Sequence, residues 1–298
     1  MIKITIRFTL QAAALAILSS CSTTIFINKP LPPEIELEQK DQKMVIQNFF
    51  DYTRDEFVKE RHEDVFRSGV MAFAAGLEDY LSESELVRAS FTDTLVKSGP
   101  GRILSDLLDP NWVVSACSEY NADLLLSIDS LFIDFDWETE TIRYDDGSRE
   151  KTKYFYLQLQ PFLTLYDKTG SLIDRSFISY EQPYSSRPTL SALITIKPNL
   201  NNATEEVVLI ASDAGKDYGA KFFESMGSFP YRVYYGKPFN VAFILMQNRQ
   251  WADAIRELQP FASSTDSKVA KRAANNLYVA YTGLGDEISA QMWLERSK

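Results

Sequence analysis

The sequence LLLSIDSLFIDFDW (residues 124–137) alternates between apolar and polar side chains, as a β-strand with one buried face does. The alternation has two phases, one with Leu124, Leu126 and Ile128, the other with Leu131, Ile133, Phe135 and Trp137. The phase slips by one residue at Asp129-Ser130. Because such a slip would turn every later side chain to the opposite face, we expect a β-bulge or a sharp bend there.

Two further strands follow and predict an antiparallel meander. Asp145-Asp146-Gly147 is a hairpin-turn sequence. The return strand carries an apolar phase formed by Phe155, Leu157, Leu159, Leu163 and Leu165. Residues 167–170 (DKTG) mark a second turn, after which residues 172–180 form a third strand.

Strand and helix patterns precede the meander. Apolar runs predict strands over residues 44–50 and 86–92, and apolar residues at helical spacing predict a helix over residues 65–81. Asp109-Pro110 predicts another helix start, since Asp is a favoured N-cap and Pro fits the first helical position. The sequence therefore predicts an α+β fold, in which helices cover a mixed sheet with an antiparallel meander.

A longer helix is predicted after the meander. Asn202 with Glu205 resembles a capping box and predicts a helix that runs to about Met226. Small side chains recur every fourth residue in it, at Ala211, Gly215 and Gly219. Since each Gly inside a helix costs up to ~1 kcal/mol relative to Ala, we expect this stripe to pack closely against the sheet.

The last part of the chain predicts paired helices. Residues 240–258 and 276–294 align at an offset of 36, with Ala254 on Ala290 and Leu258 on Leu294. Residues 251–255 (WADAI) and the later Pro260 resemble the second helix of a tetratricopeptide repeat, whose period is about 34 residues. Fewer than about three such units rarely stand alone. We therefore expect residues 237–298 to be a short, all-α tetratricopeptide-like region packed against the preceding domain.

The N-terminus has the parts of a secretory signal. Lys3 and Arg7 precede an apolar core of about 11 residues, too short for the ~20 that cross a bilayer as a helix. Leu18-Ser19-Ser20-Cys21 resembles the lipobox of bacterial lipoproteins. The resemblance implies that residues 1–20 are a signal peptide and that Cys21 carries a diacylglyceryl thioether and an N-acyl chain such as palmitate. Several acyl chains hold a protein on a membrane durably.

Residues 21–43 are predicted to be a lipidated tether, followed by an α/β domain over residues 44–236. Residues 23–27 have the pattern of a short strand, and the prolines after them force an extended connection. Ser22 is not the Asp that retains many lipoproteins at an inner membrane, and residues 22–27 lack an acidic export cluster. By resemblance we expect the outer membrane, with the protein facing the periplasm.

Charge and cysteine content limit the partners. Removal of residues 1–20 would leave 29 Lys and Arg against 41 Asp and Glu, a net charge of −12. Such a surface repels phosphate backbones, so we expect no nucleic-acid partner. Cys117 would be the one thiol besides Cys21, so no intramolecular disulfide is expected. Its apolar neighbours favour a buried side chain over a reactive thiol.

No motif predicts catalysis or a cofactor. The HExxH, CxxC, GxSxG and Walker-type spacings do not occur. The one histidine, His62, lies in the densely charged segment 51–64, which favours a solvated surface side chain over a catalytic or metal-binding one. We therefore expect a protein that is not an enzyme and has no cofactor.

Carboxylates share one phase of the first meander strand, at Asp134, Asp136, Glu138 and Glu140. The interpretation we favour is the solvent face of an amphipathic strand. Two others stay open. Asp134 and Asp136 are candidate ligands for a hard cation such as Ca²⁺, and a glycosidase-like carboxylate pair is also conceivable.

Aromatic side chains occupy the second phase of the return strand, at Tyr154, Tyr156, Phe162 and Tyr166. They belong to the core if both faces of the sheet are covered, and form a glycan- or protein-binding face if not. Tyr231, Tyr234 and Tyr235 raise the same question. For both sets we favour the core.

Several segments together resemble a known family. Residues 121–126 (NADLLL) resemble the strand entry of periplasmic α/β domains of the TolB N-terminal or curli-secretion lipoprotein type. Residues 165–167 (LYD) and 172–174 (LID) resemble the central hairpin of a lipoprotein family of Bacteroidetes-type bacteria. The C-terminal half of that family is resembled by three further parts of this chain: residues 214–220 (AGKDYGA), residues 251–254 (WADA), and Pro230, Arg232, Tyr234 and Tyr235. The chain departs from the family at two positions, where Gly219 and Tyr231 replace the expected Ala and Trp. That family has no established activity, so no functional residue carries over.

These observations favour a membrane-anchored envelope lipoprotein that acts as a binding or scaffold module. Its partners would be the membrane, through lipidated Cys21, and an envelope protein. The alternative is a carbohydrate- or cation-binding periplasmic protein, with or without hydrolytic activity, that uses the acidic and aromatic hairpin over residues 134–166.

Overall fold

The computed structural model describes residues 22–37, 39–53, 59–95, 106–188 and 197–298. Contacts divide the chain into two compact units. We call residues 32–224 the sheet unit, and the described part of residues 1–31 together with residues 225–298 the helical unit. These divisions differ from the predicted boundaries at 43/44 and 236/237, because a strand from the predicted tether pairs with one that precedes the C-terminal helices.

The sheet unit contains a six-stranded mixed sheet, as the sequence predicts. Its strands follow the order β3-β2-β4-β5-β6, and β7 also pairs with β5. Their bounds are β2 Gln42–Asn48, β3 Val87–Leu95, β4 Leu124–Arg143, β5 Arg149–Asp167, β6 Leu172–Phe177 and β7 Tyr180–Pro188. β2 is parallel to β3 and β4, whereas β4, β5 and β6 form the predicted antiparallel meander. The predicted third strand is thus two strands, β6 and β7.

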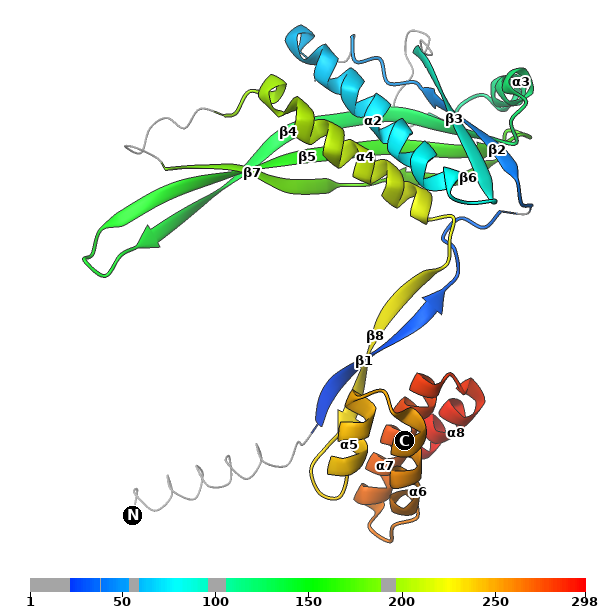
Figure 1. Cartoon of the computed structure of the whole chain (residues 1–298), viewed down its shortest axis with the longest axis vertical. Coiled ribbons are helices and arrows are strands. Elements are labelled where there is room, and N and C mark those ends of the chain that lie inside the picture. The colour runs from blue at the N-terminus through cyan, green and yellow to red at the C-terminus, as the bar shows by residue number, and fades with distance from the viewer. Residues whose placement is uncertain (1–21, 38, 54–58, 96–105, 189–196) are drawn as a thin grey trace. The chain divides into compact units, whose positions relative to one another are not determined.

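The expected phase slip is a register shift in the β4–β5 ladder. Ile128 pairs with Leu163, and the next pair is Ser130 with Phe162, so one residue of β4, Asp129, has no opposite partner. Beyond this bulge the two strands continue as a long hairpin that projects from the rest of the sheet unit (Figure 1). The bulge keeps the buried apolar side chains of β4 on one face from Leu124 to Phe135.

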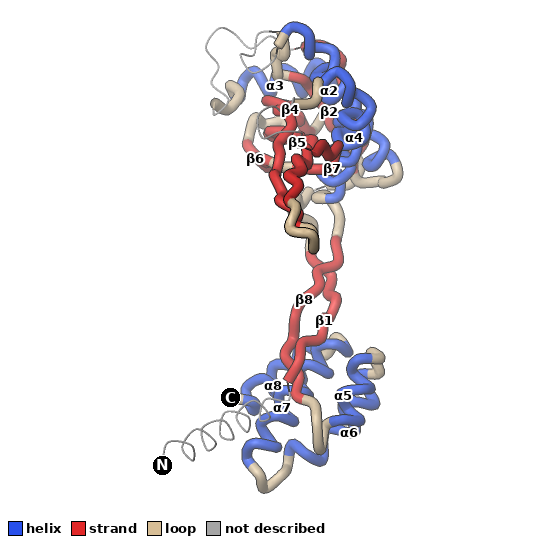
Figure 2. The backbone as a smooth tube through the Cα atoms, turned by 90° about the vertical axis from the view of Figure 1, so that its left-hand side faces the viewer, coloured by secondary structure: helices blue, strands red, loops and turns tan. Residues whose placement is uncertain are grey.

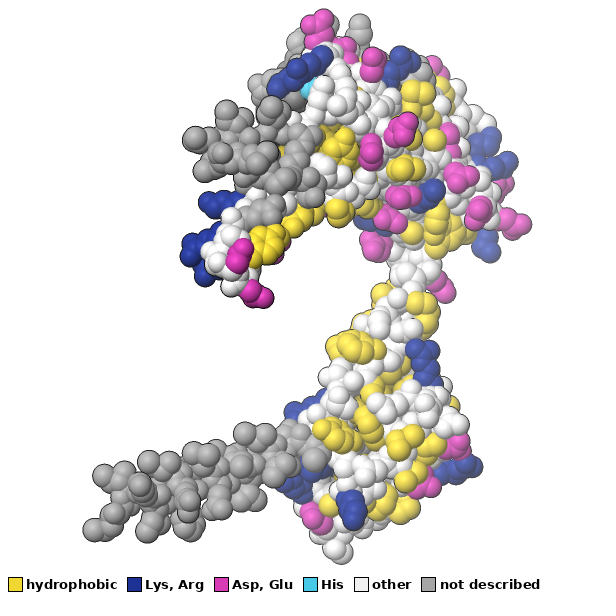
Figure 3. Space-filling view, turned by 60° about the vertical axis from the view of Figure 1, so that its left-hand side comes forward, with side chains coloured by type: hydrophobic (Ala, Val, Ile, Leu, Met, Phe, Trp, Pro, Cys, Tyr) yellow, Lys and Arg dark blue, Asp and Glu magenta, His cyan; other side chains and the backbone are white. Residues whose placement is uncertain are grey.

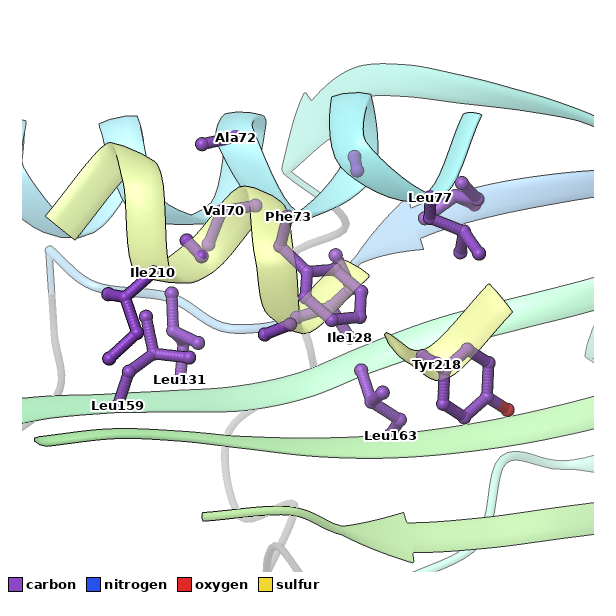
Figure 4. Close-up of a cluster of buried hydrophobic side chains, with 14 of the residues drawn as sticks. Val70, Ala72, Phe73, Leu77, Ile128, Leu131, Leu159, Leu163, Ile210 and Tyr218 are labelled. Atoms are coloured by element: carbon purple, nitrogen blue, oxygen red, sulfur yellow. The ribbon is translucent and has the colours of Figure 1, made fainter. Parts of the chain in front are cut away.

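Two helices cover one face of the sheet. α2 (Glu63–Ser82), preceded by the 3₁₀ turn η1 (Glu60–His62), and α4 (Thr204–Ala220), preceded by η2 (Leu200–Ala203), lie side by side (Figure 1). Their apolar faces meet the sheet in the main core. Figure 4 shows Val70, Phe73, Leu77, Ile210 and Tyr218 of the helices beside Ile128, Leu131, Leu159 and Leu163 of the strands.

The glycines of α4 pack against α2, not against the sheet as the small-residue stripe predicted. A Cβ atom at Gly215 would lie 2.1 Å from the carbonyl oxygen of Phe73, and one at Gly219 would meet Tyr80. Gly76 of α2 is equally close to Ser212 of α4. The stripe was correctly assigned to packing, but the sequence did not reveal that its partner was another glycine-bearing helix.

The opposite face is partly covered by α3 (Pro110–Tyr120), which lies across the strands from α2 and α4 (Figure 2). Asp109 caps it as predicted, since its carboxylate accepts hydrogen bonds from the N–H groups of Asn111 and Trp112. Asn121 ends it in the left-handed conformation. Val113, Ala116 and Cys117 pack on Leu125 and Tyr166, which confirms burial of Cys117 and Tyr166.

The predicted bounds of α4 were wrong at both ends. The helix begins at Thr204 with Ala203 in the N-cap position, and Asn199 instead caps the preceding turn η2. It ends at Ala220, and Met226 already lies in β8 (Ser225–Tyr234). The sequence concealed this strand because Gly227 and Pro230 lie in it, and both disfavour a sheet interior. They are tolerated because β8 has a single partner strand.

The helical unit joins a two-stranded antiparallel ribbon to four helices. β1 (Ser22–Leu31) pairs with β8 over its whole length. The helices are α5 (Asn240–Gln247), α6 (Trp251–Ala262), α7 (Ser267–Leu284) and α8 (Glu287–Ser297). Ile27 and Val233 of the ribbon are buried in one core with residues of α5, α6 and α7. Phe26 and Met226 of the ribbon are exposed, and Figure 3 shows hydrophobic side chains along it.

The C-terminal helices that the sequence predicts are present and packed together. α6 and α8 begin 36 residues apart, at Trp251 and Glu287, which matches the offset in the sequence. Ala254 and Ala290 are both buried. The ring of Trp251 packs over Gly283, where a Cβ atom would lie 2.5 Å from ring carbons. The resemblance to tetratricopeptide repeats stays a prediction.

Candidate functional site

The two faces of the β4–β5 hairpin differ in character. Ile133 pairs with Leu159 and Phe135 with Leu157 on the face toward α2 and α4, and all four side chains are buried. Asp134 pairs with Gln158, Asp136 with Tyr156 and Glu138 with Tyr154 on the other face. We call this second face the open face. Trp137, assigned by the sequence to the apolar phase, is 48% exposed because it lies beyond the covering helices.

Tyr154, Tyr156 and Phe162 lie on the open face and are partly exposed, so the favoured assignment of these side chains to the core was wrong. None of the three packs against the main core. The physical reason is that α3 covers only the end of this face near Leu125 and Tyr166. Tyr166 alone of this set is in the core.

An aromatic patch occupies the open face where β4, β5 and β6 run together. Phe162 and Phe177 are cross-strand partners with ring centroids 6.4 Å apart. The guanidinium of Arg175 lies 4.8 Å from the centre of the Phe162 ring. Phe177 is 63% exposed and Phe132, on the neighbouring strand, 38%. The aromatic patch, defined as Phe132, Phe162, Arg175 and Phe177, leaves apolar side chains exposed on a part of the sheet that no helix of the described residues covers.

Polar side chains border the aromatic patch. The amide Nε2 of Gln158 donates to Glu181 Oε2 at 3.0 Å and to Asp136 Oδ2 at 3.4 Å, which joins β4, β5 and β7 in one row. Asp136 also accepts a hydrogen bond from the backbone N–H of Trp137. The rim of the patch therefore carries negative charge that an amide holds in place.

Asp134 is not free on this face, since its carboxylate is 2.6 Å from the ammonium of Lys197. Lys197 also lies 5.8 Å from the centre of the Trp137 ring. Within the described ranges no three side chains of the types His, Cys, Asp and Glu cluster so as to hold a metal ion. Asp134 and Asp136 as cation ligands stay a prediction, and Lys197 is the group that a cation would have to displace from Asp134.

His62 is buried, 8% exposed, and the expectation of a solvated side chain was wrong. Its Nδ1 lies 2.6 Å from Asn201 Oδ1, and Arg61 Nε donates to its Nε2 at 3.3 Å. Because Nε2 accepts, Nδ1 carries the proton and donates to Asn201. His62 is buried despite its charged sequence neighbours because η1 packs against η2, which carries Asn201, 139 residues later in the chain. Its role is to join those two turns.

A buried carboxylate at the bulge was not singled out by the sequence. Asp129 is 9% exposed and accepts hydrogen bonds from Ser127 Oγ and Thr164 Oγ1. The residue left unopposed in the ladder thus turns its side chain back to neighbours on β4 and β5. An acidic residue at the point where a strand changes phase was the available signal.

Cys117 is buried beneath α3. Burial raises the pKa of its thiol to about 11, and the nearby carboxylates of Asp167 and Asp123 add to the rise. The thiol is therefore protonated, and weakly reactive, at neutral pH. Cys21, the predicted lipidation site, lies outside the described residues.

The first described residue, Ser22, is fixed at one end of the β1–β8 ribbon. It pairs with Tyr234, and its Oγ accepts hydrogen bonds from Nε and Nη2 of Arg232 at 3.1 and 3.0 Å. Two guanidinium groups lie near the Tyr234 ring, that of Arg232 at 5.4 Å and that of Arg272 at 5.1 Å from its centre. We call Ser22, Arg232, Tyr234, Tyr235 and Arg272 the ribbon end.

The ribbon end is held to α7 by two asparagines. The backbone N–H of Tyr234 donates to Asn276 Oδ1 at 2.8 Å, and Asn276 Nδ2 donates to the Tyr234 carbonyl at 2.7 Å. Asn275 Nδ2 donates to the Arg232 carbonyl at 2.8 Å. Tyr231 and Tyr234 pack on the helical core as favoured, whereas Tyr235 is 39% exposed.

Comparison with known proteins adds little to this geometry. No protein-family model matches the chain, and no curated protein matches it. Among solved structures it is similar to a minor lipoprotein from Acinetobacter baumannii, at 10% identity over 61% of this chain and 91% of that chain, with a TM-score of 0.26. A similarity of this extent assigns neither a family nor a role, so the resemblance to a lipoprotein family stays a prediction.

No helix in the described part of the chain is both long and apolar enough to cross a bilayer.

Proposed function

We propose that this chain is a lipid-anchored protein of the cell envelope that binds an envelope partner protein without catalysing a reaction on it. The anchor is supported by Leu18-Ser19-Ser20-Cys21. Ser22 in place of Asp supports the outer membrane, with the protein facing the periplasm. Cys21 immediately precedes β1, so the acyl chains would be attached next to a folded element.

The observation that carries the binding role is the aromatic patch on the open face of the sheet. Phe177 and Phe132 expose apolar surface, and Asp136 and Glu181 lie at its rim. The sheet unit as a whole has 19 Lys and Arg against 35 Asp and Glu. Charge complementarity therefore favours a partner that presents apolar side chains flanked by Lys or Arg.

The anchor is tested by Cys21→Ser in cells fed labelled palmitate. The wild-type chain should incorporate label and remain in the membrane fraction, because its acyl chains lie in the bilayer. Cys21→Ser should lose the label and either leave the membrane fraction or keep residues 1–20. Label that persists in the variant would refute lipidation at Cys21.

The binding role is tested by photo-crosslinking in cells, with a photoreactive phenylalanine placed at Phe177 or, as the control, at Leu209. These side chains are almost equally exposed, 63% and 64%, but Leu209 lies on α4 across the sheet. A protein adduct should form at 177 and not at 209. Its yield should fall about tenfold when Glu181→Lys reverses a rim charge. Equal adducts at both positions, or adducts insensitive to Glu181, would argue against the aromatic patch as the binding face.

A second candidate is carbohydrate binding on the same face. It is favoured by Tyr156, whose ring neighbours the amide of Gln158 and the carboxylate of Asp136, since glycan sites combine an aromatic face with hydrogen-bonding groups. Calorimetry with envelope glycans should then show binding that Tyr156→Ala abolishes.

For a cation, the midpoint of thermal unfolding should rise with Ca²⁺ in the wild-type chain and not in Asp136→Asn. If the glycans give no heat of binding and Ca²⁺ does not shift the thermal midpoint, binding of a protein partner is left as the function.

A further inference from the structure

The two units of the chain carry opposite charge. The helical unit, counted over residues 22–31 and 225–298, has 10 Lys and Arg against 6 Asp and Glu. The sheet unit has 19 against 35. An anionic surface therefore attracts the helical unit and repels the sheet unit. The net charge of −10 of the whole sequence conceals this division.

The chain position that would carry the lipid adjoins the basic unit. Cys21 directly precedes Ser22 in the sequence, and consecutive Cα atoms of a polypeptide are about 3.8 Å apart. Ser22 is held by the ladder to Tyr234 and by the Arg232 guanidinium. Asn276 in turn holds Tyr234 to α7. An anchor at Cys21 would therefore bring the ribbon end to the headgroup region with almost no slack.

The side chains at the ribbon end suit that environment. Guanidinium groups bind phosphate through several N–H donors, and aromatic rings with a polar tip favour the interface between water and hydrocarbon. Arg232 and Arg272 lie against the Tyr234 ring, and Tyr235 is partly exposed beside them. α5, whose Phe243 ring packs 5.4 Å from that of Tyr235, exposes the apolar side chains of Val241 and Ile244.

We propose that the ribbon end is a membrane-docking surface that binds the phosphate headgroups of anionic phospholipids. The proposal deepens the proposed function and rests on it for the place of the anchor. Docking gives the anchored protein a defined face toward the bilayer, the helical unit. The basic residues supply a second attachment besides the acyl chains, and each one near the surface raises the membrane affinity by about fivefold at most.

The test uses the processed chain, residues 21–298 with Cys21→Ser, which contains both units whole and carries no lipid. Vesicles of phosphatidylcholine alone are compared with vesicles in which about a third of the lipid is phosphatidylglycerol. The chain should co-sediment with the second and not with the first. Arg232→Gln with Arg272→Gln should reduce its partition coefficient about 10- to 30-fold.

The control is Arg249→Gln with Arg256→Gln, which has the same net charge. Arg256 lies on α6 and pairs with Asp253, and Arg249 lies between α5 and α6. The control should bind nearly as the parent does, and Arg232→Lys with Arg272→Lys should recover most of the binding. Thermal unfolding of each variant should match the parent, so that lost binding is not lost folding. Equal losses in both glutamine pairs, or equal binding to both vesicle types, would overturn the proposal.

This result is separable from that of the palmitate experiment. A chain that is labelled at Cys21 in cells but ignores anionic vesicles keeps its anchor and loses the docking surface. Conversely, vesicle binding that depends on Arg232 and Arg272 in a chain that takes up no palmitate would sustain the docking surface and remove the anchor.

Discussion

Gly76 of α2 and Ser212 of α4 lie where the two helices cross, so close that a Cβ atom on Gly76 would lie 2.1 Å from the Ser212 carbonyl oxygen. The approach is mutual, because a Cβ atom on Gly215 would lie 2.1 Å from the carbonyl oxygen of Phe73. The atoms that would be met are backbone and have no rotamer to change. These two glycines therefore set the distance between the helices that cover the sheet.

Gly76→Ala should lower the free energy of unfolding by about 2–4 kcal/mol, because the added methyl group forces the helices apart. Urea denaturation followed by circular dichroism measures the change. Gly219→Ala is the control. Its Cβ would meet side-chain atoms of Tyr80 and Leu77, which can move, and the better helix propensity of Ala offsets part of the cost. A Gly76→Ala protein as stable as Gly219→Ala would mean that the crossing is looser than described.

Asn276→Ala should destabilise the helical unit by about 2–3 kcal/mol, since it leaves the N–H and carbonyl groups of Tyr234 without their buried partner. Hydrogen exchange of peptides from β8 and α7 reports on this unit separately from the sheet unit. Asn275→Ala removes one more exposed bond, to the Arg232 carbonyl, and should cost about 1 kcal/mol or less. Asn276→Ala should cause a larger loss of exchange protection than Asn275→Ala. Equal losses would mean that the two hydrogen bonds of Asn276 to Tyr234 do not hold the ribbon to α7.

The Cys117 thiol should resist alkylation in the folded protein at neutral pH and react quickly after unfolding. Because its folded pKa of about 11 exceeds the usual 9.0, an unfolded chain loses the thiol proton first. The contribution of the buried thiol to stability is thus full below pH 9 and declines as pH rises toward 11. Denaturation of Cys117→Ala and the wild type across this range should give a difference that shrinks with rising pH; a constant difference would contradict the shift.

Asp123 gives the opposite pH dependence. Hydrogen bonds from the Lys168 side chain and the Lys43 backbone hold the pKa of its carboxyl below the usual range. The stability it contributes is present above the unfolded pKa of about 4 and is lost as pH falls through the lower folded value. Asp123→Asn should therefore cost about 0.5–1 kcal/mol at pH 7, after allowance for screening of a partly exposed pair, and progressively less in acid. A cost that persists unchanged in acid would point to packing in place of charge.

Local signals in the sequence were sufficient for much of the sheet unit. The bulge at Asp129 follows from alternation alone, and the start of α3 follows from Asp109-Pro110, because both depend on neighbours in the chain. The α+β class with a mixed sheet and C-terminal helices is likewise confirmed. What failed depends on distant partners. The burial of His62 requires Asn201, and β8 is a strand only because β1 pairs with it.

The candidate sites show the same limit. The alternation of side chains correctly placed Tyr156 and Leu157 on opposite faces of the sheet. It does not reveal whether a helix covers the face on which Tyr156 lies. The ribbon end is harder still, since Ser22 and Arg232 are 210 residues apart in the chain. The charge difference between the units was present in the sequence but visible only once Leu31 and Ser225 were known to divide them.

The pairing of Leu31 with Ser225 has a consequence for how the polypeptide can be cut. Directly opposed residues of an antiparallel pair have Cα atoms about 4.5–5.5 Å apart, a span that a two-residue Asn-Gly turn closes. Residues 22–31 joined through that turn to residues 225–298 should form an ordinary hairpin followed by four helices. In the sequence, the sheet unit is an insertion between the two strands of a hairpin. Deletion of residues 32–224 should therefore leave a helical unit that folds by itself.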